Sequence, residues 1–248
     1  MDMRQVVCIT GASQGLGAAI ARAFHAAGYR VAVTDVNESG AAALALELDG
    51  SGNTALPFAL DVRSQADFEK VRDDLLARCG AVHGLVNNAV MTVARPVLDI
   101  PLDEFDAVMA VNVRGTFIGS QVFGRVFKGA GYGRIVNIAS LAGQNGGTVT
   151  GAHYAASKGA IVTLTKVFAR DLAPFGITVN AVAPGPLDTP MVHQAIPEER
   201  MAAFVANIPV GQLGDPAFVA DIVVRLAGPD AGSVTGATWD INGGLLMR

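Results

Sequence analysis

A tyrosine and a lysine lie four positions apart in the stretch HYAASKGAIVTLTK, residues 153–166. If this stretch is helical, Tyr154 and Lys158 lie on the same face, one turn apart. An ammonium group beside a phenol favours the phenolate and lowers the phenol pKa from about 10. The pair could therefore transfer protons at a reaction centre, although an ordinary tyrosine near an ordinary lysine has the same spacing. The rest of the chain must distinguish these readings.

Strand-like and helix-like segments alternate along the whole chain. Such alternation predicts a parallel sheet covered on both faces, and continuously apolar strands fit burial on both faces. We therefore expect an α/β fold: a single doubly wound Rossmann-type domain over residues 1–248, with a seven-stranded parallel sheet and helices on both faces. The predicted strands are 5–10, 30–35, 55–61, 84–89, 133–140, 176–184 and 237–241, and the predicted helices are 16–27, 38–49, 64–79, 103–128, 152–173 and 216–227.

The composition limits the classes of function. Hydrophobic residues make up 51% of the chain and charged residues 16%, which suggests that further apolar surface is buried between subunits. A formal net charge of −4 gives no reason to expect nucleic acid or a membrane surface as partner, and no apolar run is long enough to span a bilayer. Only Met1 to Gln5 precede the first strand, which leaves no room for a signal peptide, so a cytoplasmic protein is expected.

The cysteines and histidines lack the spacing of a metal site. Cys8 lies in an apolar strand and Cys79 at the end of a helix, so both are expected to be structural. His153 precedes Tyr154 but projects about 100° around the helix from it. We expect no metal and no catalytic histidine, although His193 could contact a substrate.

The first strand runs into a glycine-rich turn, TGASQGLG, followed at once by a helix. Glycines let the backbone approach a phosphate closely, and the helix N-terminus offers free N–H groups and the positive end of its dipole. A tight strand-to-helix turn without a ligand is the alternative. If the turn binds a dinucleotide, the residues that contact it are Gly11, Ser13, Gln14, Gly15, Leu16 and Gly17.

Polar residues also end the next strands. Asp35 ends the second, eighteen residues beyond Gly17, where an acid can bind ribose hydroxyls and would repel a 2′-phosphate; this favours NAD over NADP. The pairs Asp61–Val62 and Asn88–Ala89 follow strands three and four and suit the edge and face of an adenine. Capping and turn chemistry are the alternatives at all three places.

Ser140 ends the fifth strand, and Tyr154 opens the next helix fourteen residues later. In a parallel sheet both hydroxyls then point into the same crevice, beside the predicted dinucleotide. A phenol that exchanges a proton next to a nicotinamide provides the acid/base half of hydride transfer. This convergence favours the functional reading of Tyr154 and Lys158.

These residues closely resemble the short-chain dehydrogenase/reductase family over essentially the whole chain. The resemblance rests on TGASQGLG, on NNA at residues 87–89, on YAASK at residues 154–158 and on APGPLDT at residues 183–189. It implies that Ser140 holds the substrate oxygen, Tyr154 is the general acid/base, and Lys158 binds the nicotinamide ribose. It also implies that Asn112 fixes a water connected to Lys158, unless Asn112 is simply a polar residue satisfied within its own helix.

The resemblance further implies that the nicotinamide carboxamide is held by Pro184, Gly185, Leu187 and Thr189, and that residues 185–214 form a mobile substrate lid. One position departs from the family pattern: Val90 follows NNA where the family usually has glycine. This valine lies on the adenosine side of the expected cofactor site, and it reshapes that contact rather than excluding NAD.

The nearest branch resembles 3-oxoacyl-carrier-protein reductases and small secondary-alcohol dehydrogenases. Carrier-docking reductases have basic residues where this chain has Gly131 and Phe175, and they usually take NADP. We therefore expect NAD-dependent interconversion of a small secondary alcohol and its ketone, in a pocket lined by residues 91–94, residues 141–151 and the lid. The alternatives are a 3-oxoacyl-carrier-protein reductase and a non-catalytic NAD-binding regulator. Substrate identity, stereospecificity and physiological direction are left open.

Two predicted helices, 103–128 and 152–173, are apolar on more than one face. One face can cover the sheet, so the remainder needs another cover. In the resembled family these helices form a four-helix contact between subunits. We therefore expect a homotetramer, or at least a dimer.

Overall fold

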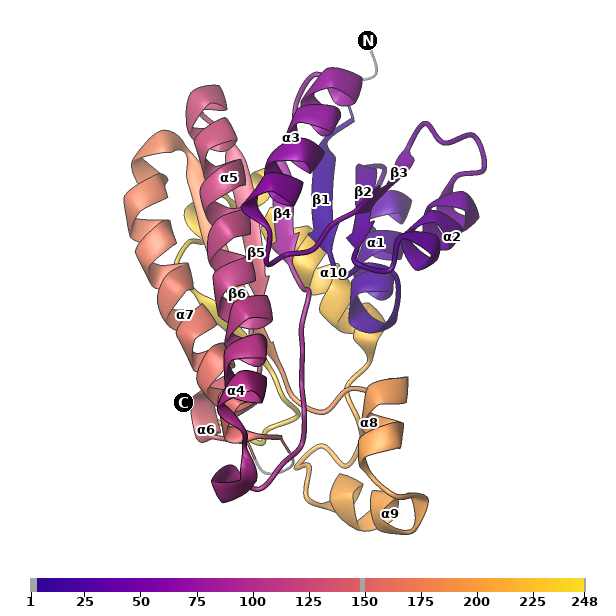
Figure 1. Cartoon of the computed structure of the whole chain (residues 1–248), viewed down its shortest axis with the longest axis vertical. Helices are drawn as coiled ribbons and strands as arrows, with labels where there is room; N and C mark the ends of the chain where they lie inside the picture. Colours follow the sequence, from indigo (N-terminus) through magenta and orange to yellow (C-terminus); the bar gives the residue numbers. More distant parts are fainter. Residues whose placement is uncertain (1–3, 148–149, 248) are drawn as a thin grey trace.

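A computed structural model describes residues 4–147 and 150–247, and its centre is one parallel sheet of seven strands (Figure 1). The strand order is β3-β2-β1-β4-β5-β6-β7, so the order reverses between β1 and β4. Ligands of such sheets bind beyond the carboxyl ends of the strands at this reversal. The strands are β1 (Val6–Thr10), β2 (Arg30–Asp35), β3 (Ala55–Ala59), β4 (Gly84–Asn87), β5 (Gly133–Ile138), β6 (Ile177–Pro184) and β7 (Thr238–Ile241).

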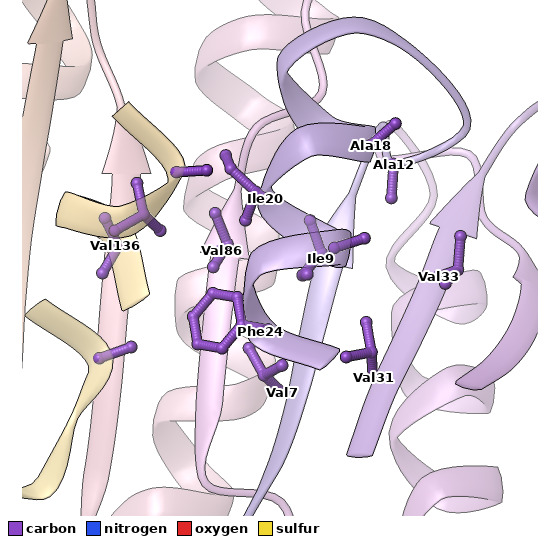
Figure 2. Packing of buried hydrophobic residues seen from close by; sticks show 14 of the residues in the cluster. Val7, Ile9, Ala12, Ala18, Ile20, Phe24, Val31, Val33, Val86 and Val136 are labelled. Carbon is purple, nitrogen blue, oxygen red and sulfur yellow. The ribbon is translucent and has the colours of Figure 1, made fainter. Parts of the chain in front are cut away.

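Helices cover both faces of the sheet, as predicted. On one face, Ile20 and Phe24 of α1 pack against the strand valines shown in Figure 2, and α2 and α10 complete that core. On the other face, Phe68 of α3 and Phe123 of α5 lie in a second core, and α7 packs beside α5. The helices of these two layers are α1 (Gly15–Ala26), α2 (Glu38–Leu48), α10 (Pro216–Ala227), α3 (Gln65–Cys79), α5 (Gly115–Ala130) and α7 (Ala152–Leu172).

The helix predicted over 103–128 is present, as an unbroken helical run from Leu102 to Ala130, but it contains a π turn that was not predicted. The structure has α4 (Leu102–Met109), a π-helical turn at Ala110–Arg114, and then α5. The wider turn coincides with Asn112, whose side chain bonds to other segments, and with Thr116, whose hydroxyl donates to the Asn112 carbonyl oxygen at 2.8 Å. Single π turns occur often at functional sites.

Segment 185–214 contains two short helices, α8 (Pro190–Ala195) and α9 (Glu198–Ala206). Figure 1 shows them together beyond the carboxyl ends of the strands. The short helix α6 (Ala142–Asn145), which was not predicted, lies just after β5. Part of the predicted pocket loop, residues 148 and 149, lies outside the described residues.

Several strands end earlier than predicted, because their last residues leave the ladder. After β4, for example, the Asn88 backbone N–H donates to the Thr10 hydroxyl oxygen at 3.0 Å rather than to a strand carbonyl. In the described part of the chain, no helix has the length and apolar character needed to cross a membrane. The same residues contain no group of three or more metal-binding side chains.

Candidate active site

The glycine turn fits tightly against the end of β4. A Cβ on Gly11 would lie 2.7 Å from the Ala89 Cα, and a Cβ on Gly17 would lie 2.1 Å from the Gly11 carbonyl oxygen. Gly15 differs: its φ is +55° and a Cβ there would meet no described atom within 4 Å. The turn is therefore closed toward the sheet and open on its outer side, which is the shape that a backbone cradle for a phosphate requires.

Asn88 holds this turn in place. Its Nδ2 donates to the Thr10 and Gly11 carbonyl oxygens, at 3.0 and 2.9 Å. The Thr10 hydroxyl oxygen in turn accepts from the backbone N–H groups of Asn88 and Ala89, both at 3.0 Å. The side chain of Asn88 thus faces the glycine turn, and Val90 after it is exposed. The structure shows that Asn88 joins β1 to β4, and the contact with an adenine predicted from the sequence stays a prediction.

The two strand-end carboxylates have different surroundings. Asp35 accepts from the Ser13 N–H at 3.0 Å and from the Asn37 N–H at 2.9 Å, so it is fixed against the glycine turn. Asp61 is paired with the exposed Arg63, with a shortest N–O distance of 2.6 Å. The Arg63 hydrogen bond is the main cause that lowers the Asp61 pKa. Val62 is buried against Gly115, where a Cβ would lie 2.9 Å from the valine Cβ.

Ser140, Tyr154 and Lys158 converge beyond the end of β5. The hydroxyls of Tyr154 and Ser140 are hydrogen-bonded. Lys158 is 2% exposed; its Nζ donates to the Ile138 carbonyl oxygen at 2.6 Å and lies 5.7 Å from the centroid of the Tyr154 ring. The predicted helical spacing therefore places a phenol, a hydroxyl and an amine at one crevice.

The pKa of Tyr154 is raised, whereas the sequence predicted that the ammonium of Lys158 would lower it. Burial raises the phenol pKa above its ordinary value, and the hydrogen bond with Ser140 only partly offsets this rise. Burial also lowers the pKa of Lys158 to about 7. Desolvation disfavours phenolate and ammonium alike, and it is the largest cause of both shifts.

The side-chain hydrogen bonds of Asn112 go to other segments of the chain. The alternative, a polar residue satisfied within its own helix, is therefore wrong. Its Oδ1 accepts from the Met91 N–H at 2.8 Å, and its Nδ2 donates to the Met91 carbonyl oxygen and the Ser157 hydroxyl, both at 2.9 Å. Ser157 donates to the Tyr154 carbonyl oxygen at 2.7 Å. Asn112 therefore joins the loop after β4 to the first turn of α7. Its predicted water stays a prediction.

The predicted lid is closed at its base. Gly214 donates its N–H to the Pro186 carbonyl oxygen and accepts from the Asp188 N–H, both at 2.9 Å, with Leu187 buried between them. Gly185 lies so near Asn242 that a Cβ would be 2.9 Å from its Cα. Pro184 ends β6 and Thr189 precedes α8, so these residues follow the strand into the crevice. The exposed His193 is 2.7 Å from Asp188, and no described contact assigns it to a substrate.

Two buried polar groups were not found from the sequence. Asn87 donates to the Asn137 side-chain oxygen at 2.8 Å, and Asn137 donates to the Thr165 hydroxyl at 2.9 Å. His153 is fully buried with its Nε2 3.2 Å from Glu104. The hydrogen-bond partners of these residues lie on elements distant in sequence, so no local pattern could predict the contacts. The sequence shows only that polar residues interrupt apolar runs at these positions.

Comparison with known proteins identifies the family to which the chain belongs. The family model described as enoyl-(acyl carrier protein) reductase matches residues 11–246. The chain belongs to the short-chain dehydrogenase/reductase family of oxidoreductases. The predicted family and fold class are thus confirmed.

Its relatives include enzymes with different substrates in their names. The chain is 36% identical to a 3-oxoacyl-acyl-carrier-protein reductase of Vibrio harveyi, covering 98% of both chains. It is 34% identical to a sorbitol dehydrogenase of Cereibacter sphaeroides, covering 96% of both. It is 35% identical to a D-threitol dehydrogenase of Mycolicibacterium smegmatis, covering 98% of this chain and 94% of that one.

The fold agrees with a solved member of the family. The crystal structure of a short-chain type dehydrogenase/reductase from Mycobacterium marinum has a TM-score of 0.92 at 32% identity, covering 98% of this chain and 96% of that one. These matches fix the family, and the substrate must be argued from the site.

Proposed function

We propose that this protein is an NAD(H)-dependent dehydrogenase that interconverts a small secondary alcohol and its ketone, with Tyr154 as general acid/base. The observation that carries the proposal is the hydrogen-bonded pair of Ser140 and Tyr154 with Lys158 buried behind it. A bound nicotinamide would accept the hydride from the alcohol or deliver it to the ketone. The chain itself must bind the dinucleotide, orient the substrate oxygen and move one proton.

The residues present fit a dinucleotide. The glycine turn and the first N–H groups of α1 provide a cradle for the pyrophosphate, with Gly15 open on its outer side. An ammonium carries three N–H donors, and among the described residues Ile138 takes one of those of Lys158, which leaves donors for ribose hydroxyls. Asp61, Val62, Asn88, Ala89 and Val90 form the adenine end, and Pro184, Gly185, Leu187 and Thr189 form the nicotinamide end.

Asp35 supports NAD over NADP. Two backbone N–H groups fix its carboxylate. A fixed carboxylate can accept hydrogen bonds from ribose hydroxyls and repels a 2′-phosphate. Val36 and Asn37, which follow, carry no positive charge to offset that repulsion. The next arginine in the sequence after Asp35 is Arg63, and it is paired with Asp61.

In the proposed reaction the substrate oxygen lies between the hydroxyls of Ser140 and Tyr154. During oxidation Tyr154 takes the alcohol proton after it has lost its own, and during reduction the phenol gives its proton to the oxygen. Lys158, with a pKa brought to about 7 by burial, can gain or lose a proton at neutral pH and so exchange one near the phenol. Asn112 and Ser157 fix the backbone of the turn that carries Tyr154.

A carrier-bound acyl substrate is the second candidate. One observation favours it: the Lys128 ammonium lies 4.1 Å from the ring centroid of Phe175, so a cation lies beside a position where the resembled carrier-docking enzymes have a basic residue. Against it, Gly131 and Phe175 themselves carry no charge. A free, neutral small molecule agrees better with this surface.

We also propose a cytoplasmic homotetramer of single-domain subunits, each with residues 185–214 as lid. Phe117 on α5 and Val167 on α7 are about two-fifths exposed, at 41% and 39%, and the Phe117 ring packs against Phe168 at a centroid distance of 5.7 Å. This apolar face on two adjacent helices supports a helix-to-helix contact between subunits.

The test is a panel of small secondary alcohols, ketones and a 3-oxoacyl carrier substrate, each assayed with both dinucleotides. We expect kcat/KM to be highest for a free alcohol or ketone with NAD(H). A clear preference for NADPH and the carrier substrate would replace this proposal with the second candidate. Absence of turnover together with dinucleotide binding would favour a regulator.

A further inference from the structure

The first turn of α7, which carries Tyr154, has no N-terminal cap. Gly151 occupies the cap position and makes no side-chain hydrogen bond to the turn, and the first turn contains no acidic residue. An uncapped helix start leaves several backbone N–H groups without helical partners and is usually the least fixed part of a helix. Something other than a cap must hold the phenol in place.

A row of three charged or polar side chains reaches this turn from the surface. The Arg95 guanidinium binds both oxygens of Glu104, with two contacts of 2.9 Å and one of 3.2 Å. Glu104 Oε1 lies 3.2 Å from His153 Nε2. Exposure falls along the row, from 40% at Arg95 to 15% at Glu104 and 0% at His153. His153 immediately precedes Tyr154.

The imidazole is fitted to this place. His153 Nδ1 is buried and has no partner among the described residues, so the tautomer with its proton on Nε2, which donates to Glu104, avoids a buried unpaired N–H. A Cβ on Gly151 would lie 2.2 Å from the His153 Cε1. Gly151, which has no side chain to cap the helix, is therefore also the residue that leaves room for the imidazole.

The same turn is held from its other side. Gly151 donates its N–H to the Val93 carbonyl oxygen at 3.2 Å, and Ser157 links the Tyr154 carbonyl to Asn112. Both connections lead to the loop after β4, which also carries Arg95 and forms one wall of the proposed substrate pocket. The pocket wall and the turn that carries Tyr154 are thus connected as one unit.

We propose that Arg95, Glu104 and His153 are positioning residues that hold the Tyr154 hydroxyl against Ser140 in place of a helix cap. This inference rests on the proposed function of Tyr154. None of the three touches the reacting atoms; they act through the backbone of the turn. A small displacement of an acid/base group lowers kcat strongly, while substrate and dinucleotide contacts remain.

The test compares Glu104→Gln with Glu47→Gln. Glu47 forms a similar two-point pair with Arg22, at 2.9 Å for each contact, on an exposed surface away from the crevice. We expect Glu104→Gln to lower kcat about tenfold or more, because the phenol is no longer held in position, with KM and dinucleotide Kd within about twofold. Arg95→Ala, an exposed position, should act in the same direction with a smaller effect.

The pH profile of kcat for alcohol oxidation separates positioning from stability. Ser140 lowers the Tyr154 pKa. If Glu104→Gln loosens the contact between the phenol and Ser140, the apparent pKa in the profile should rise. In Glu47→Gln the apparent pKa should stay unchanged. If Glu104→Gln lowers only the melting temperature, with kcat and the profile unchanged, the inference is overturned. If the wild-type protein itself turns over no alcohol or ketone, the proposed function is wrong. That result can be distinguished from a failure of the positioning inference, which compares variants of an active enzyme.

Discussion

The two ends of the crevice are built in different ways. At the dinucleotide end, backbone groups and glycines dominate: Gly11 and Gly17 contact Ala89 and Asn88 at distances that exclude a side chain. At the reactive end, side chains dominate: Ser140, Tyr154 and Lys158 converge from β5 and α7, and long-range hydrogen bonds fix them. The first end depends on close backbone approach, and the second on positions set by distant residues.

The largest expected effect on dinucleotide binding lies at the backbone end. Gly17→Ala would bring a Cβ to 2.1 Å from the Gly11 carbonyl oxygen and 2.5 Å from the Asn88 Nδ2. We expect dinucleotide affinity to fall roughly a hundredfold, equivalent to about 3 kcal/mol. Calorimetry with NAD measures this. Gly50→Ala is the control, since a Cβ there meets no described atom within 4 Å, and equal affinities for the two variants would disprove the cradle.

Asp35→Ser tests cofactor choice at the same end. Hydrogen bonds to a charged group contribute about 1.5–3 kcal/mol, so we expect the Kd for NAD to rise roughly tenfold to a hundredfold. The Kd for NADP should stay constant or fall, because the repulsion is removed. Asp73→Asn serves as control, since that exposed carboxylate on α3 is paired with Arg72 and has no role in the proposed cofactor site. An equal loss of NAD affinity in the two variants would show that Asp35 does not bind the ribose.

Lys158 makes the stability of the dinucleotide-free protein depend on pH. Its folded-state pKa of about 7 lies below the ordinary value of 10.5, so above pH 7 the unfolded chain holds a proton that the folded chain has lost. Stability from this group therefore rises with pH from 7, by about 1.4 kcal/mol per pH unit. Urea unfolding of wild type and Lys158→Met between pH 7 and 8, below the ordinary pKa values of 9.0 for Cys8 and 10.0 for Tyr154, measures the difference. Parallel curves would show that Lys158 is not desolvated.

A change at the proposed contact between subunits is expected to affect the active site least. Phe117→Asp places a charge on the exposed apolar face of α5 and should dissociate the proposed tetramer. Light scattering at micromolar concentration follows the mass. Leu46→Asp, at a 67% exposed position on α2, is the control and should leave the mass unchanged. A wild-type monomer would remove the proposed assembly.

The difference between the two ends also explains what the sequence could predict. The glycine turn, Asp35 and the Tyr154–Lys158 spacing are local patterns, and β2 has the bounds predicted for it. The π turn at Asn112 and the row from Arg95 to His153 depend on contacts between segments far apart in the chain. The rise in the Tyr154 pKa was missed for the same reason. Burial is a property of the folded chain, and sequence spacing alone overstates the effect of a neighbouring charge.

The most direct measurement is the turnover of Tyr154→Phe, made on the same sample as its NAD affinity. Removing the phenol oxygen removes the acid/base, which typically contributes about 10²–10⁴-fold, and leaves the ring in its place. We predict that kcat falls by a factor in that range for the best alcohol substrate while the Kd for NAD is unchanged. Wild-type turnover in Tyr154→Phe, with NAD still bound, would contradict the account.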